Sequence, residues 1–368
     1  MNVIISGDFS PMNRVEELIN REEHFSFGID GIDRENTMFI LNFETTIASQ
    51  FNKTITKVGP CLKCSEKVAT FLKSAGVTAV TLANNHTMDY GGEGLKNTIN
   101  LLRESGINTV GAGANEQEAQ ETLYFTYRGE TVAIINCCEH EFSYSENGTA
   151  GTNPLDPIRQ HYAIKEAKTK ADYVIVIVHG GHEFYNLPSI RMQDTYRFFI
   201  DTGADAVINH HQHCYSGYEY WNGKPIYYGL GNFCFDWPGR KQSFYKGYCV
   251  RLHLGSTVSS EEIPYTQCID KPKLVVGEFD GFRDDLKRLN EIISNRDLLK
   301  SEVNKYYDSM EKSCEGVLTP FVSDYAKELV RRGWLPKMIA KNKKLLWKAY
   351  LDCESHHDVM LHYLKKGY

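Results

Sequence analysis

The chain has 368 residues, of which 42% are hydrophobic, and a formal net charge of −6 at pH 7. Its length allows a large buried core and predicts either two domains or one large domain with an appendage. The negative charge and the lack of a recognised nucleic-acid-binding motif argue against a nucleic-acid partner. We find no internal repeat and no low-complexity segment.

Two apolar runs near the start of the chain each lead into an acidic residue. Val3–Gly7 precedes Asp8, and Met38–Phe43 precedes Glu44. Each run predicts a short strand, so each carboxylate is expected at the point where a strand stops.

Amide, imidazole and carboxylate groups follow the next predicted strand, residues 77–82. These groups belong to Asn84, Asn85, His86 and Asp89. Apolar residues then recur at helical spacing from Leu95 to Leu102. An active-site loop at the carboxyl end of an α/β strand is one interpretation. An Asn-rich turn whose side chains cap the following helix is the alternative.

Two further runs end in histidines. Residues 174–178 form a β-branched run without alternation, which is typical of a strand covered on both faces, and they lead into His179, His182 and Glu183. Residues 206–209 lead into His210, His211 and His213. His211 and His213 flank a single residue and can reach the same point.

Five predicted strands therefore end in groups that can bind metal. A single Asp or His at a strand end is usually a hydrogen-bonded structural residue, but this combination favours a shared site. Carboxylate, amide oxygen and neutral imidazole suit Mn, Fe(II), Zn or Mg. Two cations about 3.5–4 Å apart can hold both oxygens of an in-line displacement, so the predicted chemistry is hydrolysis, most naturally at phosphorus.

The start of the chain and its cysteines predict a cytoplasmic protein. The chain opens with strand-like residues, without a basic leader or a long apolar stretch, so we expect no membrane span. Its ten cysteines are scattered and include an adjacent pair, Cys137 and Cys138. Cys61 and Cys64 form a CxxC that can bind zinc or change redox state, but no second pair completes a site, so we favour reduced structural thiols.

The pattern changes near residue 281. Before it, β-branched segments alternate with predicted helices at 65–75, 156–170 and 189–201; after it, apolar residues recur at helical intervals. We therefore predict a domain at 1–282 and an all-helical extension at 283–368. The extension contains a stretch with basic residues and no acidic ones, here called the basic window: Arg331, Arg332, Lys337, Lys341, Lys343, Lys344 and Lys348. This window could bind an anionic ligand or partner. The alternative is that it forms a solvated helix surface.

The ordered segments resemble the bacterial capsule-synthesis proteins (CapA-like, poly-γ-glutamate) of the calcineurin-like metallophosphoesterase superfamily. The resemblance covers about the first three quarters of the chain and rests on Gly7-Asp8, Asn42-Phe43-Glu44, Ala83-Asn84-Asn85-His86 with Asp89-Tyr90-Gly91, His179-Gly180-Gly181-His182-Glu183, His211-Gln212-His213, and Tyr228-Gly229-Leu230-Gly231-Asn232-Phe233. It implies an α/β fold, a four-layer αββα sandwich to which the helical C-terminal extension is added.

The resemblance also implies a role for each site residue. Asp8 and His213 are expected to hold one ion, and Asn85, His179 and His211 the other, with Glu44 as the bridge. His86 is expected to protonate the leaving oxygen or steady developing charge, and Asp89 to orient His86. Glu183 is expected to face substrate or support the ligands, with solvent exposure as its alternative, and Asn232 to form a turn near the site. His182 and His210 are interpreted as bystanders.

Two positions depart from the superfamily pattern. Ser10 stands where a histidine is usual, so the first ion site is expected to be weak or empty, and Glu44 replaces the usual bridging aspartate. We predict a metal-dependent hydrolase of a phosphoester, or of a γ-glutamyl or related amide, that acts on an anionic small molecule or polymer precursor in capsule or cell-surface polymer biosynthesis. The alternative is a non-catalytic assembly component that binds an anionic polymer in the same cleft.

Overall fold

The computed structural model describes residues 1–23, 26–29, 37–311, 313–314, 329, 332, 334 and 341–365, with the backbone alone at 341–342. Its first sheet has the strand order β17-β16-β15-β1-β2-β5-β6. In that order the strands span Leu274–Val276, Ser259–Gln267, Lys246–His253, Asn2–Phe9, Thr37–Phe43, Ala79–Thr81 and Asn108–Val110. Strands β1, β2, β5 and β6 run parallel, and β15 to β17 are antiparallel to their neighbours.

The second sheet has the strand order β13-β14-β12-β11-β9-β8. In that order the strands span Tyr218–Trp221, Lys224–Tyr227, Ala206–His210, Tyr173–His179, Glu130–Cys138 and Leu123–Tyr127. The four inner strands are parallel and the two edge strands antiparallel. Two small ladders pair β3 (Thr46–Ile47) with β4 (Lys63–Cys64) and β7 (Ala112–Gly113) with β10 (Gly151–Thr152).

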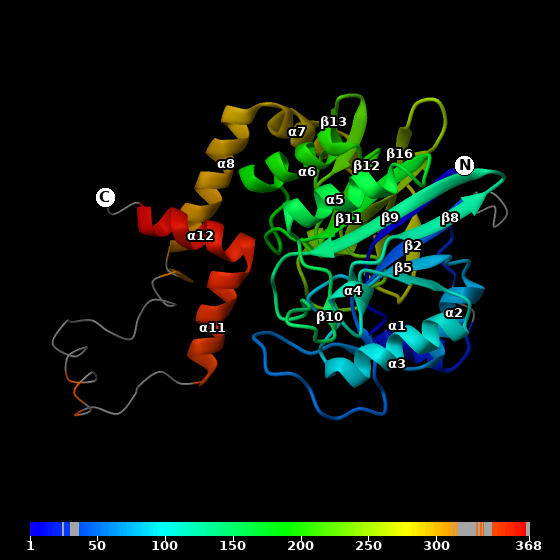
Figure 1. The fold of residues 1–368 in the computed structure, drawn as a ribbon, viewed down its shortest axis with the longest axis horizontal. Helices are drawn as coiled ribbons and strands as arrows, with labels where there is room; N and C mark the ends of the chain where they lie inside the picture. The colour runs from blue at the N-terminus through cyan, green and yellow to red at the C-terminus, as the bar shows by residue number, and fades with distance from the viewer. Residues whose placement is uncertain are drawn as a thin grey trace.

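The two sheets pack face to face, and helices cover both outer faces (Figure 1). On β1, Val3 and Ile5 join a cluster with the second sheet, whereas Ile4 faces the helices, because successive strand side chains point to opposite faces. Helices α1 (Asn13–Asn20), α2 (Lys67–Ser74) and α3 (Gly91–Glu104) cover the first sheet; α5 (Pro157–Ala167) and α6 (Ile190–Thr202) cover the second. The expected four-layer αββα sandwich is confirmed.

Local capping signals explain where the outer helices begin. The Asp156 carboxylate accepts from the backbone N–H groups of residues 158 and 159 at the start of α5, and Ser189 caps α6 in the same way. The predicted helices at 65–75, 156–170 and 189–201 correspond to α2, α5 and α6. The short elements α4 (Glu116–Ala119) and the 3₁₀ helix η1 (Gln242–Tyr245) lie in connecting segments.

The described part of the C-terminal extension is helical, as expected. It comprises α7 (Phe282–Ser294), α8 (Arg296–Ser309), α11 (Lys341–Asp352) and α12 (Glu354–Lys365), and the last three lie together at one side of the molecule (Figure 1). Apolar residues of these helices, such as Leu289, Val303 and Met360, join the same core cluster as the second sheet. The extension therefore packs on the sandwich, while a domain boundary at 282 stays a prediction.

Only some residues of the basic window lie within the part of the chain that the structure describes. Arg331 and Lys337 lie outside the described residues, as does the side chain of Lys341. Lys348 donates to Tyr144 and Asp352, so its charge is directed toward the sandwich and its own helix. No helix within the described ranges is both long and apolar enough to cross a membrane.

Gly7 allows a close backbone approach that sets the end of β1. The register of β1 on β2 shifts between Ser6 and Asp8, and Asp8 N–H donates to the Gly231 carbonyl at 3.0 Å. A Cβ on Gly7 would lie 1.9 Å from that same carbonyl oxygen.

We therefore expect Gly7→Ala to lower the free energy of unfolding by about 2–3 kcal/mol, because neither backbone segment can yield cheaply. Urea titration would measure the change. Gly255→Ala is the control, since the nearest atom to its added Cβ is 3.9 Å away. A Gly7→Ala protein as stable as the control would contradict this account of the strand end.

Candidate metal centre

Parallel strands from both sheets direct their carboxyl ends to one region. Strands β1, β2 and β5 approach it from the first sheet, and β11 and β12 from the second. The side chains they bring there are all buried and comprise the six predicted ligands, Asp8, Glu44, Asn85, His179, His211 and His213. The structure thus collects residues that are separated by up to two hundred positions in the chain.

Glu44 lies at the centre of this group. Its side chain is fully buried, and neither carboxylate oxygen has a hydrogen-bond partner among the described residues. Its Oε1 lies 3.7 Å from Nε2 of His213, 3.8 Å from Nε2 of His179 and 4.0 Å from Nε2 of His86. Burial, together with the charge of Asp8, raises the pKa of Glu44 well above its usual value.

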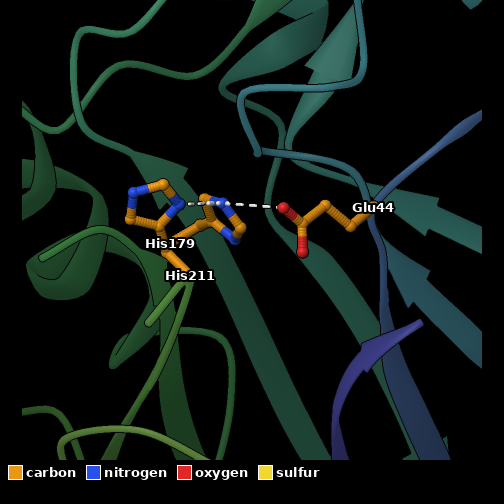
Figure 2. A group of neighbouring side chains, drawn as sticks. All are labelled: Glu44, His179 and His211. Carbon is orange, nitrogen blue, oxygen red and sulfur yellow. Dashed lines mark hydrogen bonds and ion pairs between the residues drawn. The ribbon is translucent and has the colours of Figure 1, made fainter. Parts of the chain in front are cut away.

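Two groups of candidate metal ligands share the Glu44 carboxylate. One comprises Glu44, His179 and His211, whose side chains point toward one another in Figure 2, and the other comprises Asp8, Glu44 and His213. The ligand atoms within each group lie within 4.8 Å of one another. A buried carboxylate without donors is costly unless a cation compensates it, so the donor set fits divalent metal.

The Asp8 group is held by neighbouring amides. Asp8 Oδ1 accepts from the Asn42 side chain at 2.8 Å, and Oδ2 lies 3.7 Å from Nδ1 of His213. The same Nδ1 donates to Oδ1 of Asn232 at 2.9 Å, which leaves Nε2 of His213 facing Glu44. Asn232, expected only in a turn near the site, therefore orients an imidazole directly.

The His179 group is built around the other imidazole pair. Nε2 of His179 lies 3.0 Å from Nδ1 of His211 and 3.2 Å from Oδ1 of Asn85. Its Nδ1 contacts the Asn42 amide at 3.2 Å. Burial, reinforced by the neighbouring imidazoles, lowers the pKa of His179 well below its usual value. A neutral imidazole is the form that binds metal.

His86 and Asp89 lie beside this group and share a buried lysine. Nδ1 of His86 donates to Oδ2 of Asp89 at 2.6 Å. The side chain of Lys57 is 2% exposed, forms an ion pair with Asp89 and lies 3.1 Å from the same imidazole nitrogen. Burial lowers the pKa of His86, although Asp89 opposes this shift. Lys57 was not predicted as a site residue, because it stands in a segment without helical or strand periodicity and lysine is not a metal-binding residue type.

The three uncertain residues take different positions. Nε2 of His210 donates to the Ser6 carbonyl at 2.8 Å, and His182 contacts the Tyr307 hydroxyl at 3.2 Å. Burial lowers the pKa of His182 to about 3, so it is neutral. Glu183 is exposed to solvent; partial desolvation raises its pKa, but the nearby imidazoles, His213 foremost, outweigh this effect and lower the pKa overall.

A second buried carboxylate supports the loop behind His179. Glu139 follows β9, its backbone N–H donates to the His179 carbonyl at 3.0 Å, and a Cβ on Gly180 would lie 2.6 Å from its Cγ. Glu139 accepts from Arg191 at 2.7 Å and from Ser355 of α12 at 2.6 Å. Burial raises the pKa of Glu139, but these donors outweigh it and lower it to about 2. Glu139 was not predicted as a site residue, although it too is an acid that directly follows a strand.

Comparison with known proteins gives a family. The family model described as "Bacterial capsule synthesis protein PGA_cap" matches residues 2–237, which is more than half of the chain. The chain therefore belongs to the bacterial capsule synthesis protein family. The resemblance inferred from the ordered segments is confirmed, and the matched residues include every predicted ligand.

Among curated proteins, the capsule biosynthesis protein CapA of Bacillus anthracis is 29% identical over 300 residues, covering 77% of this chain and 71% of that protein. The PGA biosynthesis protein CapA of Bacillus subtilis strain 168 is 32% identical over 229 residues, covering 61% and 60%. The chain thus spans less than two thirds of the second relative.

Among solved structures, a putative 5′-nucleotidase from Staphylococcus aureus in complex with alpha-ketoglutarate aligns with a TM-score of 0.46 at 15% identity. The alignment covers 78% of this chain and 57% of that one. A 5′-nucleotidase precursor from Thermus thermophilus gives 0.44 at 14%, with the same coverage.

The Glu139 contacts predict that α12 stabilises the sandwich. Arg191→Met would leave the carboxylates of Glu139 and Asp358 without their shared guanidinium, and we expect a loss of about 3 kcal/mol in the free energy of unfolding. Arg288→Met is the control because its pair with Asp285 is exposed, and it should cost less than about 1 kcal/mol. If chemical denaturation gives the same loss in the free energy of unfolding for both variants, the buried Arg191 network is no more stabilising than an exposed ion pair.

Proposed function

We propose that the protein is a metal-dependent hydrolase of phosphoester bonds, or of γ-glutamyl or related amide bonds, in capsule or cell-surface polymer biosynthesis. The observation that supports it most is Glu44, a fully buried carboxylate without a hydrogen-bond partner among the described residues and with three imidazoles near one oxygen. Protein groups alone leave this charge uncompensated, whereas two divalent cations would compensate it.

In this proposal Asp8 and His213 hold one ion, and Asn85, His179 and His211 hold the other. Glu44 belongs to both ligand groups and would bridge them. The donor set suits Mn, Fe or Zn, with Mg as a further candidate. When bound, such ions supply Lewis-acid activation of water and of a phosphoryl or carbonyl oxygen.

We propose that His86 handles the proton of the leaving group, and the contacts of its ring support this role. Asp89 holds Nδ1, and Nε2 faces the ligand cluster, 4.0 Å from Oε1 of Glu44. Lys57 completes the support, since it pairs with Asp89 and donates to the Asn85 carbonyl at 3.2 Å. We assign proton transfer, or stabilisation of developing charge, to Nε2 of His86, and orientation of the ring to Asp89.

The biological setting is proposed from the family. Both Bacillus relatives are named for biosynthesis of a capsule or of PGA. An anionic small molecule or a polymer precursor suits a cationic metal centre, and Glu183 and Asn232 are proposed to support substrate and ligands respectively. Because the chain spans only part of its relatives, their whole activity and partners are not transferred.

One observation favours the non-catalytic alternative. Ser10 is buried beside the end of β1, at the position where the superfamily usually has a histidine, so the Asp8 group has fewer nitrogen ligands than the His179 group. A protein that retains a single ion would serve to bind an anionic polymer. Turnover of aryl phosphomonoesters or phosphodiesters with added Mn²⁺ would distinguish catalysis from binding.

The effect of replacing Glu44 on folding stability should differ between metal-free and metal-loaded protein. In chelated protein, Glu44→Gln removes a buried acid that has no hydrogen-bond partner among the described residues, so we expect stability equal to wild type or greater by about 1–3 kcal/mol. With Mn²⁺ added, wild type should gain stability and Glu44→Gln should gain much less.

Thermal unfolding with and without Mn²⁺ measures this reversal. Glu139→Gln is the matched control, because that carboxylate is equally buried but is paired with Arg191, so the change should destabilise both forms. If Mn²⁺ leaves wild type unchanged, the two-ion proposal fails.

A second prediction separates proton transfer from metal binding. We expect His86→Asn to reduce turnover by about 10²- to 10⁴-fold with metal content near wild type, because His86 lies outside both ligand groups. His179→Asn should instead lose metal by elemental analysis. His253→Asn, a half-exposed histidine in β15, should change neither quantity. Equal metal loss in the His86 and His179 variants would refute the assigned roles.

A further inference from the structure

The loop at residues 236–241 carries an arginine without an acidic partner. Arg240 is exposed and forms no ion pair with any residue that the structure describes. Its guanidinium carbon lies 4.0 Å from the ring centre of Trp237 and 5.9 Å from that of Phe184. The nearest acid in the loop, Asp236, is already bound by Arg14 at 2.7 Å. The charge of Arg240 therefore remains available to a ligand.

The aromatic residues around Arg240 also contact the candidate metal centre. The His213 ring lies 5.7 Å from that of Phe184 and 6.1 Å from that of Phe244. Phe244 is itself 5.8 Å from the guanidinium. Phe184 and Phe244 therefore each lie near both the Arg240 guanidinium and the ring of His213, a proposed metal ligand.

Phe184 has an unusual conformation for its position. Its φ is 60°, in the left-handed region that bulky side chains rarely adopt, and its side chain is 51% exposed. Its backbone N–H donates to the Gln212 carbonyl at 2.8 Å, between the two histidines of the His211–His213 segment. Strained backbone conformations of this kind cluster at active sites, ligand-binding segments and switch regions.

We infer that Arg240, Phe184 and Trp237 form a subsite for a second oxyanion group of the substrate, beside the group that reacts at the metal centre. The inference rests on the proposed function. A guanidinium stacked on an indole keeps a fixed plane and presents a fork of N–H donors that matches a carboxylate or phosphate. The loop is also held in place, because the Arg240 N–H donates to the Tyr245 hydroxyl at 3.0 Å and this hydroxyl donates to the Trp237 carbonyl at 3.0 Å.

Matched phosphonates provide the test. The probes are alkylphosphonates from propyl to hexyl, each with and without a terminal carboxylate, titrated calorimetrically into the full-length protein loaded with Mn²⁺. We expect at least one carboxylated probe to bind about tenfold more tightly than its plain partner. Bisphosphonates of the same chain lengths are titrated as a second set of probes. Whichever terminal group, carboxylate or phosphonate, increases the affinity more over the unsubstituted alkylphosphonate is the group that the subsite prefers.

Substitutions assign any preference to the subsite. Arg240→Gln should abolish the preference without changing affinity for the plain probes, and Arg240→Lys should retain part of it. Arg128→Gln is the matched control, because Arg128 is also exposed and stacked on a tyrosine, but lies in the β8–β9 turn. Unchanged melting temperatures would show that each variant folds.

The outcomes also separate this subsite from the proposed function. Binding of plain probes without any preference for a second oxyanion overturns the subsite alone. A preference that survives Arg240→Gln does the same. Failure of every probe to bind metal-loaded wild type overturns the proposed function and, with it, the subsite.

Discussion

The buried carboxylate of Glu44 is the constraint on which the centre depends. Donors nearby are already engaged: the Asn42 amide donates to Asp8, the Asn84 amide donates to the Phe43 carbonyl, and Lys57 is paired with Asp89. The groups around Glu44 thus have partners, whereas Glu44 itself has no hydrogen-bond donor among the residues that the structure describes. Fixed acceptors gathered in a dry site are preorganised for cations, since the fold rather than the ion has met the cost of bringing them together.

Much of the fold was predictable because its signals are local. The β-branched run at 174–178 is buried on both faces as β11, and capping residues fixed the starts of α5 and α6. The strand ends were also informative, because parallel strands place their carboxyl ends at one edge of a sheet. To predict that Asp8, Glu44 and the histidines lie together, only the order of the strands in the sheets was needed in addition, and the family resemblance implied that order. Their roles as ligands stay predictions.

Other features could not be predicted because they depend on contacts between distant segments. Lys57 stands in an irregular stretch, and nothing in its neighbours indicates that its ammonium is buried against Asp89. The role of Glu139 likewise depends on Arg191 and on Ser355, more than two hundred residues away. Amphipathic spacing predicted that the C-terminal helices hide an apolar face, but it carries no information about which surface they cover.

The pairing of β1 has a consequence for how the chain matures during synthesis. This strand is made well before β15, one of its two neighbours in the sheet, and before Gly231, whose carbonyl accepts from the Asp8 N–H at the end of β1. Until Gly231 and β15 have been made, one edge of β1 stays unpaired and Asp8 lacks its backbone hydrogen bond. Such non-local pairing folds slowly and exposes an unpaired edge to aggregation. The candidate metal centre contains Asp8, so it can be completed only after Gly231 and β15 have been translated.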